Sequence, residues 1–119
     1  MKPVPTLLID PHRLFRQGLV RLLEATRYHV VAEYASIEEA MRSSPQPVAP
    51  QLVVADSSSD TAQAIPQLRA AFPEARLVML TSGMHLERLR QVGELPVQGF
   101  LTKELEPSEL TSSLDRIMD

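Results

Sequence analysis

Four polar residues stand at or just after the ends of apolar runs: Asp10, Asp56, Thr81 and Lys103. Continuous apolar runs of this length are typical of strands that are covered on both faces. The carboxyl ends of parallel strands meet at one edge of a sheet, where ligands usually bind. Carboxylates are also the preferred ligands of hard divalent cations. The pattern therefore predicts a site at this edge, and the first interpretation of Asp10 is part of an acidic metal site.

The composition limits the function classes that need to be considered. The chain has 119 residues, a formal net charge of −3 and no cysteine. We expect one domain, no nucleic-acid binding by this segment itself, and neither disulfides nor thiolate chemistry. The first apolar run is too short for a signal peptide or a membrane span. These features favour a cytoplasmic protein with no membrane partner.

Strand and helix patterns alternate along the whole chain. Pro66 lacks an amide proton and fits best in a first turn, which predicts a short third helix. Five strands alternating with five helices through short links predict an α/β domain with a parallel sheet covered on both faces. The expected strands are residues 6–10, 29–34, 52–55, 76–80 and 97–101, and the expected helices are residues 14–23, 36–44, 66–72, 84–92 and from 107 onward.

The chain resembles the receiver domain of two-component response regulators over essentially its whole length, and NarL/LuxR-type regulators most closely. Two runs carry the resemblance, namely His12–Leu19 (His-Arg-Leu-Phe-Arg-Gln-Gly-Leu) and Gly99–Lys103 (Gly-Phe-Leu-Thr-Lys), together with the interval from Thr81 to Lys103. The resemblance implies a flavodoxin-like (CheY-like) doubly wound α/β fold. Its five-stranded parallel sheet would have the order 2-1-3-4-5 and five helices, and the domain would receive signals rather than act as an enzyme.

The resemblance also implies roles for individual residues. Asp56 matches the phospho-accepting aspartate, whose carboxylate attacks a phosphohistidine of a partner histidine kinase. Thr81 matches the hydroxyl and Lys103 the lysine that stabilise the transferred group together with a divalent cation. Phe100 matches the aromatic residue whose rotamer follows the switch. Ser82 is small, as access to the phosphoryl group requires.

The chain departs from the family pattern in two places. The usual acidic pair is Asp-Asp, but Pro11 follows Asp10 here, so the carboxylate that usually contacts Mg²⁺ is missing. The loop after Asp56 reads Ser-Ser-Ser-Asp in place of the family's Met-Pro-Gly, and the segment to Thr81 is shorter than usual. We therefore expect weak Mg²⁺ binding at most. The candidate ligands are Asp10, Asp56, Ser58 and Asp60, of which Asp60 is either a substitute carboxylate or a turn residue.

Other interpretations of these side chains remain open. Without a phosphoryl group, Lys103 is expected to pair with Asp56 or Asp10 and so hold like charges together. Phe100 is either a moving switch or static packing. The three histidines show no metal-ligand spacing, which favours surface or structural positions for His12, His29 and His85.

Two functions follow from the family resemblance. The first is an atypical receiver that acts as a dimerisation or partner-binding switch, controlled by another regulatory protein, a ligand or its expression, and Pro11 favours it. The second is a conventional receiver that a histidine kinase phosphorylates on Asp56. An independent phosphatase has no support, because the chain lacks an Asp-x-Asp after the first strand and a glycine-rich phosphate loop.

The resemblance also bears on what lies outside residues 1–119. NarL/LuxR-type regulators carry a C-terminal helix-turn-helix domain that binds DNA. We therefore expect such a domain in the full-length protein, although this receiver sequence ends at Asp119 without one. DNA would be contacted only through that domain, and a homodimer is expected.

Overall fold

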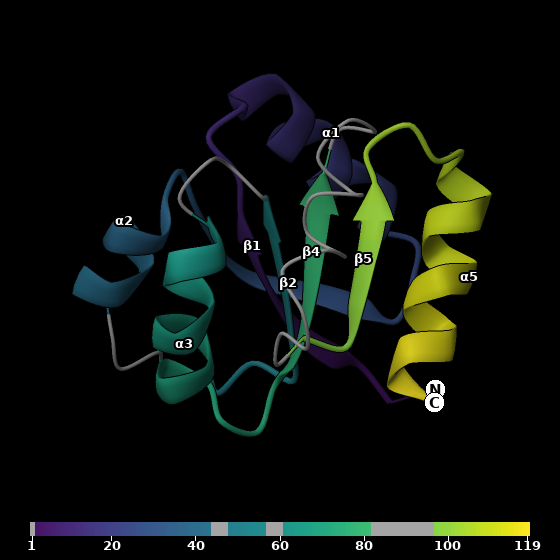
Figure 1. Ribbon diagram of the computed structural model, residues 1–119. Helices are drawn as coiled ribbons and strands as arrows, with labels where there is room; N and C mark the ends of the chain where they lie inside the picture. The colour runs from purple at the N-terminus through teal and green to yellow at the C-terminus, as the bar shows by residue number, and fades with distance from the viewer. Residues whose placement is uncertain (1, 44–47, 57–60, 82–96) are drawn as a thin grey trace.

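A five-stranded sheet forms the centre of the molecule, with helices on both of its faces (Figure 1). The computed structural model describes residues 2–43, 48–56, 61–81 and 97–119. The strands lie in the order β2-β1-β3-β4-β5 and every neighbouring pair is parallel, as predicted. Their bounds are β1 (Val4–Ile9), β2 (Tyr28–Tyr34), β3 (Leu52–Asp56), β4 (Arg76–Thr81) and β5 (Gly99–Thr102).

Successive residues of the central strands enter two different hydrophobic clusters. In β3, Leu52 and Val54 belong to one cluster, whereas Val53 and Ala55 belong to the other. The same alternation holds for the central residues of β1 and β4. Since adjacent side chains of a strand point to opposite faces, a sheet covered on both sides needs apolar residues at every position. This burial explains the continuous apolar runs of the sequence.

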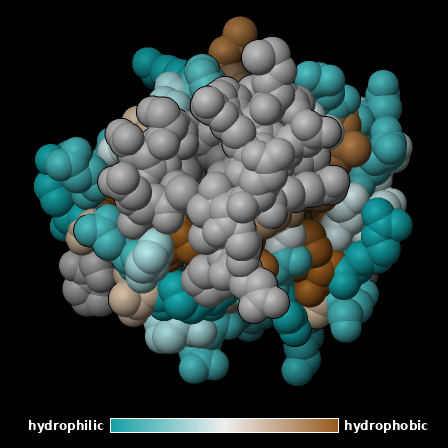
Figure 2. Space-filling model, in the orientation of Figure 1, coloured by the Kyte–Doolittle hydropathy of each residue, from teal (hydrophilic) through white to brown (hydrophobic). Residues whose placement is uncertain are grey.

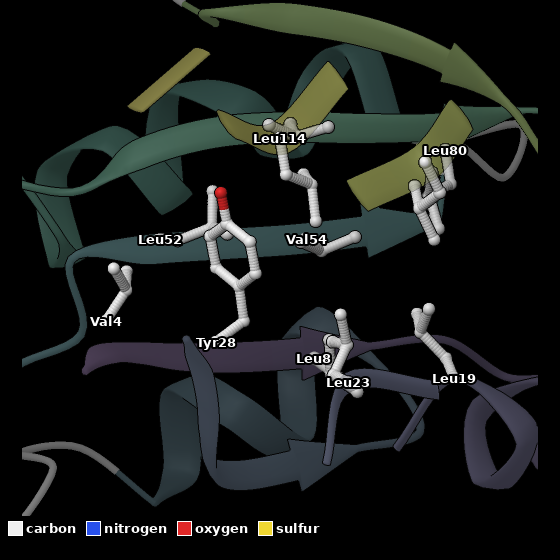
Figure 3. Close-up of a cluster of buried hydrophobic side chains, with 11 residues drawn as sticks. Val4, Leu8, Leu19, Leu23, Tyr28, Leu52, Val54, Leu80 and Leu114 are labelled. Carbon is white, nitrogen blue, oxygen red and sulfur yellow. The ribbon is translucent and has the colours of Figure 1, made fainter. Parts of the chain in front are cut away.

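The first cluster lies between the sheet and two helices, α1 (Arg13–Leu23) and α5 (Pro107–Met118). Leu23 of α1 and Leu114 of α5 are each 1% exposed. Figure 3 shows these side chains with Tyr28, whose ring lies among them and whose hydroxyl is the one polar atom drawn. Pro107 is the first residue of α5, as predicted, and the Glu106 main-chain amide donates to the Glu109 side chain just after it.

The second cluster lies under α2 (Ile37–Arg42) and α3 (Thr61–Ala71), which neighbour one another on the opposite face of the sheet (Figure 1). Ile65 and Leu68 of α3 are fully buried there. The Ser36 hydroxyl accepts a 3.1 Å hydrogen bond from the Glu39 amide and so caps the start of α2, where the sequence predicts a helix cap.

One expected helix boundary is wrong. Pro66 was expected in a first turn, but α3 begins at Thr61 and Pro66 lies inside it. A proline within a helix loses one main-chain hydrogen bond. Burial of Ile65 and Leu68 on either side of it favours the longer helix, while Pro66 itself is exposed. The helix expected at residues 84–92 lies outside the described residues.

The described surface that is visible in Figure 2 is mostly polar. Figure 2 shows hydrophilic side chains around the outline of the molecule, with hydrophobic surface in smaller areas between them. Leu14, at 89%, and Val48, at 47%, are the exposed large hydrophobic residues of the described ranges. Within those ranges, no helix has the length and apolar character needed to cross a membrane.

Candidate functional site

The pairing of β1 with β3 brings the two sequence-predicted aspartates together. Ile9 is opposite Ala55 in this parallel pair, so Asp10 and Asp56 follow as neighbours at the carboxyl ends of the strands. The chain leaves β1 towards α1 and β2 on one side and leaves β3 towards β4 on the other. In such sheets the place where the strand order reverses is the usual binding site.

The pairing of β4 with β5 brings the predicted lysine to the same edge. Thr81 is opposite Thr102, and the main-chain amide of Lys103 donates a 2.8 Å hydrogen bond to the Thr81 carbonyl. The Lys103 side chain then reaches back across the strand ends to the two aspartates. Three segments far apart in the sequence therefore supply one cluster of charges.

The Lys103 ammonium lies between the two carboxylates. Its Nζ is 2.8 Å from Oδ2 of Asp10 and 2.7 Å from Oδ1 of Asp56. The side chains of Asp10, Asp56 and Lys103 are only 4%, 9% and 15% exposed, so water screens these charges poorly. Two neighbouring buried carboxylates repel one another unless a cation lies between them. The expectation that Lys103 holds these like charges together is confirmed.

Asp10 is held in place by its main chain as well as its side chain. Its amide donates to the Tyr34 carbonyl at 3.0 Å, and its carbonyl accepts from Nη1 of Arg16 at 2.6 Å. Oδ1 accepts a 2.7 Å hydrogen bond from the His12 amide. Oδ2, however, is buried and accepts no hydrogen bond from the described residues. The Lys103 contact at 2.8 Å compensates its charge without hydrogen-bond geometry.

His12 is part of this cluster, which the sequence analysis did not anticipate. Its Nδ1 lies 3.1 Å from Oδ1 of Asp10 and 3.0 Å from Nζ of Lys103. The histidine side chain is 66% exposed, so its surface position was correctly expected, but one ring nitrogen faces the charged edge. The signal was available in Asp10-Pro11-His12, because a turn after a strand can bring alternate residues together. This sequence alone does not predict the contact, because the conformation of the turn is not evident from it.

The remaining predicted site residues divide into two groups. Thr81 is fully buried at the end of β4, and Phe100 is partly buried against the cluster under α2 and α3. Ser58, Asp60 and Ser82 lie outside the described residues.

Asp10, His12 and Asp56 are placed to share a metal ion. Each offers one ligand atom, and these atoms all lie within 4.8 Å of one another. Two of the three are carboxylate oxygens, which suit Mg²⁺, and the third is an imidazole nitrogen, which Mg²⁺ rarely uses. Pro11 is exposed and has no side-chain oxygen to add. The described donor set therefore fits a divalent cation, with fewer oxygens than Mg²⁺ prefers.

Comparison with known proteins agrees with this geometry. The profile of the response regulator receiver domain matches residues 6–115. The chain is 30% identical over 118 residues to a nitrate/nitrite response regulator protein homolog of Haemophilus influenzae, and the match covers 93% of this chain and 55% of that protein. The chain thus spans about half the length of this curated relative.

Solved structures show the same fold at lower identity. RcsB from Salmonella enterica serovar Typhimurium, bound to promoter rprA with phosphomimetic BeF3⁻, has a TM-score of 0.83 and 21% identity, covering 96% of this chain and 67% of that one. The signal receiver domain of a modulated diguanylate cyclase from Desulfovibrio desulfuricans G20 has a TM-score of 0.80 and 21% identity, covering 98% and 94%. Together with the profile match, the acidic strand ends and the strand order, these likenesses establish that the chain belongs to the response regulator receiver domain family.

Proposed function

We propose that this receiver is atypical and acts as a dimerisation or partner-binding switch with weak or no Mg²⁺-dependent phosphorylation. The observation that carries the proposal is the make-up of the acidic edge. Asp10 and Asp56 share the ammonium of Lys103, and Pro11 adds no third carboxylate beside them. A hard cation would have to displace the ammonium while gaining fewer oxygen ligands than it prefers. Control by a partner protein, a ligand or protein level requires no such step.

A conventional phosphorylation switch is the second candidate, and one observation favours it. Asp56, Thr81 and Lys103 all lie at the edge where a transferred phosphoryl group would be stabilised. In that reaction an oxygen of Asp56 attacks the phosphorus of a phosphohistidine on a histidine kinase. The new P–O bond forms as the P–N bond breaks, and the departing imidazole takes up a proton. Lys103 would then compensate the charge of the phosphoryl oxygens.

The dimer face that we propose includes α1 and α5. An apolar pocket lies between these helices, and Phe15, Leu19, Leu105 and Leu110 contribute to its walls. On the same family argument, we propose that the full-length protein is a cytoplasmic transcription regulator. Its DNA contacts would come from a C-terminal helix-turn-helix domain.

Amide NMR during a titration with Mg²⁺ and then beryllofluoride separates the two functions. An atypical receiver should show only small, unsaturated shifts at Asp56, Thr81 and Phe100 in millimolar Mg²⁺. Large saturable shifts at these three residues would establish the phosphorylation switch instead. The variant Pro11→Asp is the matched positive control, because it restores a carboxylate next to Asp10. It should bind Mg²⁺ more tightly than the wild type.

A further inference from the structure

One face of α1 presents a projecting leucine next to a gap in the helix surface. Leu14 and Gly18 are four residues apart, so they lie on the same face of the helix, one turn from each other. Leu14 is 89% exposed, and Gly18 is exposed as well. Apart from the helix's own main chain, a Cβ atom at position 18 would meet no heavy atom of the described residues within 4 Å. The space beside Gly18 is therefore open to another side chain.

The gap at Gly18 belongs to the apolar pocket between α1 and the start of α5. This pocket has a volume of about 260 Å³, which is ample for a leucine side chain. Besides Gly18, its walls include Phe15, Leu19, Leu22, Leu105 and Leu110. Leu14 is not one of the lining residues and projects from α1 into solvent. The chain thus carries both an apolar pocket and, next to it, an apolar side chain that does not fill it.

The two sides of the pocket carry opposite charges. The sequence of α1 contains three arginines and no acidic residue, and one of them, Arg21, lies on the same face as Leu14 and Gly18. On the other side of the pocket, residues 104–112 contain no basic residue and three exposed glutamates, namely Glu104, Glu106 and Glu109. A two-fold axis through such a face places the basic side of each copy against the acidic side of the other. The surface is therefore complementary to a second copy of itself.

A second copy accounts for these features better than a smaller occupant does. A small apolar molecule would fill the pocket but leave the Leu14 side chain in water. It would also make no use of the opposite charges on the two sides. A second protomer covers the leucine, the pocket and both charged segments at once, because each contact of a two-fold interface occurs twice.

We propose that the receiver forms a two-fold homodimer in which Leu14 of each protomer enters the pocket beside Gly18 of the other. In this arrangement Arg21 faces the acidic segment, residues 104–109, of the partner. The inference rests on the proposed dimerisation switch and deepens it by naming the contacts. The pocket also borders the acidic edge, because the ring of Phe15 forms one of its walls and lies 4.5 Å from Nζ of Lys103.

The test is sedimentation velocity over a concentration series, with variants that fill or empty the proposed contact. Gly18→Leu fills the gap from within its own chain and should raise the dimer dissociation constant by about tenfold or more. Its monomer should be no less stable to heat than that of the wild type, since a Cβ atom has room at position 18 and leucine favours a helix over glycine. Leu14→Ala should weaken the dimer to a similar extent. Val48→Ala is the matched control, because Val48 is exposed but lies outside α1 and α5, and it should change nothing.

The charge pairing has a test of its own. Arg21→Glu should raise the dimer dissociation constant, and added salt should weaken the wild-type dimer more than the dimer of this variant. Arg42→Glu makes the same change of charge at an exposed position of α2, on the opposite face of the sheet, and should leave the dimer unchanged. An equal loss in both variants would show an effect of net charge alone and would contradict the pairing.

A wild type that stays monomeric would overturn the proposal, and so would a dimer that Gly18→Leu and Leu14→Ala leave intact. In the latter case another face forms the dimer, and the proposed dimerisation switch stands without this inference. Native mass spectrometry that finds a monomer with a small molecule retained would assign the pocket to a ligand, which also overturns the proposal. The Mg²⁺ and beryllofluoride titration tests the atypical function independently of all these outcomes.

Discussion

The hydroxyl of Tyr28 donates a 2.6 Å hydrogen bond to Oδ1 of Asp115, which joins the first residue of β2 to the last turns of α5. Nε of Arg27 contacts the same oxygen at 3.1 Å, and its Nη2 lies 3.1 Å from Oδ1 of Asp119. Burial of the ring, followed by the bond to Asp115, raises the pKa of Tyr28 to about 12, although Arg27 acts in the opposite direction. The hydrogen bond between Tyr28 and Asp115 links the start of β2 to the C-terminal part of α5.

The raised pKa predicts a loss of stability in alkaline solution. In the unfolded chain Tyr28 loses its proton near pH 10, whereas in the folded protein it keeps the proton until about pH 12. The stabilisation is therefore complete below pH 10 and disappears as the pH rises to about 12. Tyr28→Phe should lower the free energy of unfolding by about 1–2 kcal/mol at pH 7. The free energy of unfolding, measured by urea denaturation, should fall less steeply between pH 10 and 12 for the variant than for the wild type. An identical slope in the two proteins would contradict the assignment of this pKa to Tyr28.

Removing the lysine of the acidic edge should destabilise the metal-free fold. Lys103→Met leaves Asp10 and Asp56 side by side without their ammonium. Breaking a buried ion pair by removing one partner costs about 3 kcal/mol. The midpoint temperature of thermal unfolding should therefore be clearly lower in Lys103→Met than in the wild type. Adding Asp56→Asn to this variant should restore part of the lost stability. If the double variant is no more stable than Lys103→Met alone, repulsion between the carboxylates is not the cause.

Two helical leucines, one exposed and one buried, should respond very differently to truncation. Leu114 is 1% exposed in the cluster under α1 and α5, whereas Leu14 is 89% exposed on α1. Leu114→Ala should cost about 2–5 kcal/mol through lost burial and the cavity it leaves. Leu14→Ala should change stability by less than about 0.5 kcal/mol. A reduced dimer affinity of Leu14→Ala, measured by analytical ultracentrifugation, would place that leucine in the proposed interface.

The proline inside α3 is expected to lower the stability of the protein. Pro66 is exposed and lies in the middle of α3, directly after the buried Ile65. Pro66→Ala restores a main-chain donor and should stabilise the protein by about 1–3 kcal/mol, offset in part by greater freedom of the unfolded chain. Gln67→Ala, at the exposed neighbouring position, is the control and should have little effect. A stability of Pro66→Ala at or below that of the wild type would show that the helix tolerates proline without cost.

The sheet could be predicted from the sequence because burial on both faces leaves a strong pattern. Leu7, Leu8 and Ile9 are all buried, so the first strand is a continuous apolar run followed by a carboxylate. The α3 boundary could not be predicted from Pro66, since the local preference of proline was overridden by tertiary packing.

The acidic edge was only partly predictable, for a related reason. Asp10 and Asp56 follow recognisable strands, and parallel pairing brings such ends together. His12 comes after the bend at Pro11 that follows β1, and no periodic pattern in the sequence describes such a bend. Its position facing Asp10 and Lys103 emerges only when the whole edge is assembled.

Through the main-chain hydrogen bond from Lys103 to Thr81, this lysine links the charged cluster to the end of β4. Its amide is fixed to the end of β4, and α5 begins shortly after it, while its side chain reaches to β1 and β3. Whatever draws the ammonium away from the two aspartates must act on a residue whose backbone is anchored in the sheet. We therefore expect that a displacement of this ammonium would also shift the main chain of Lys103, four residues before the start of α5.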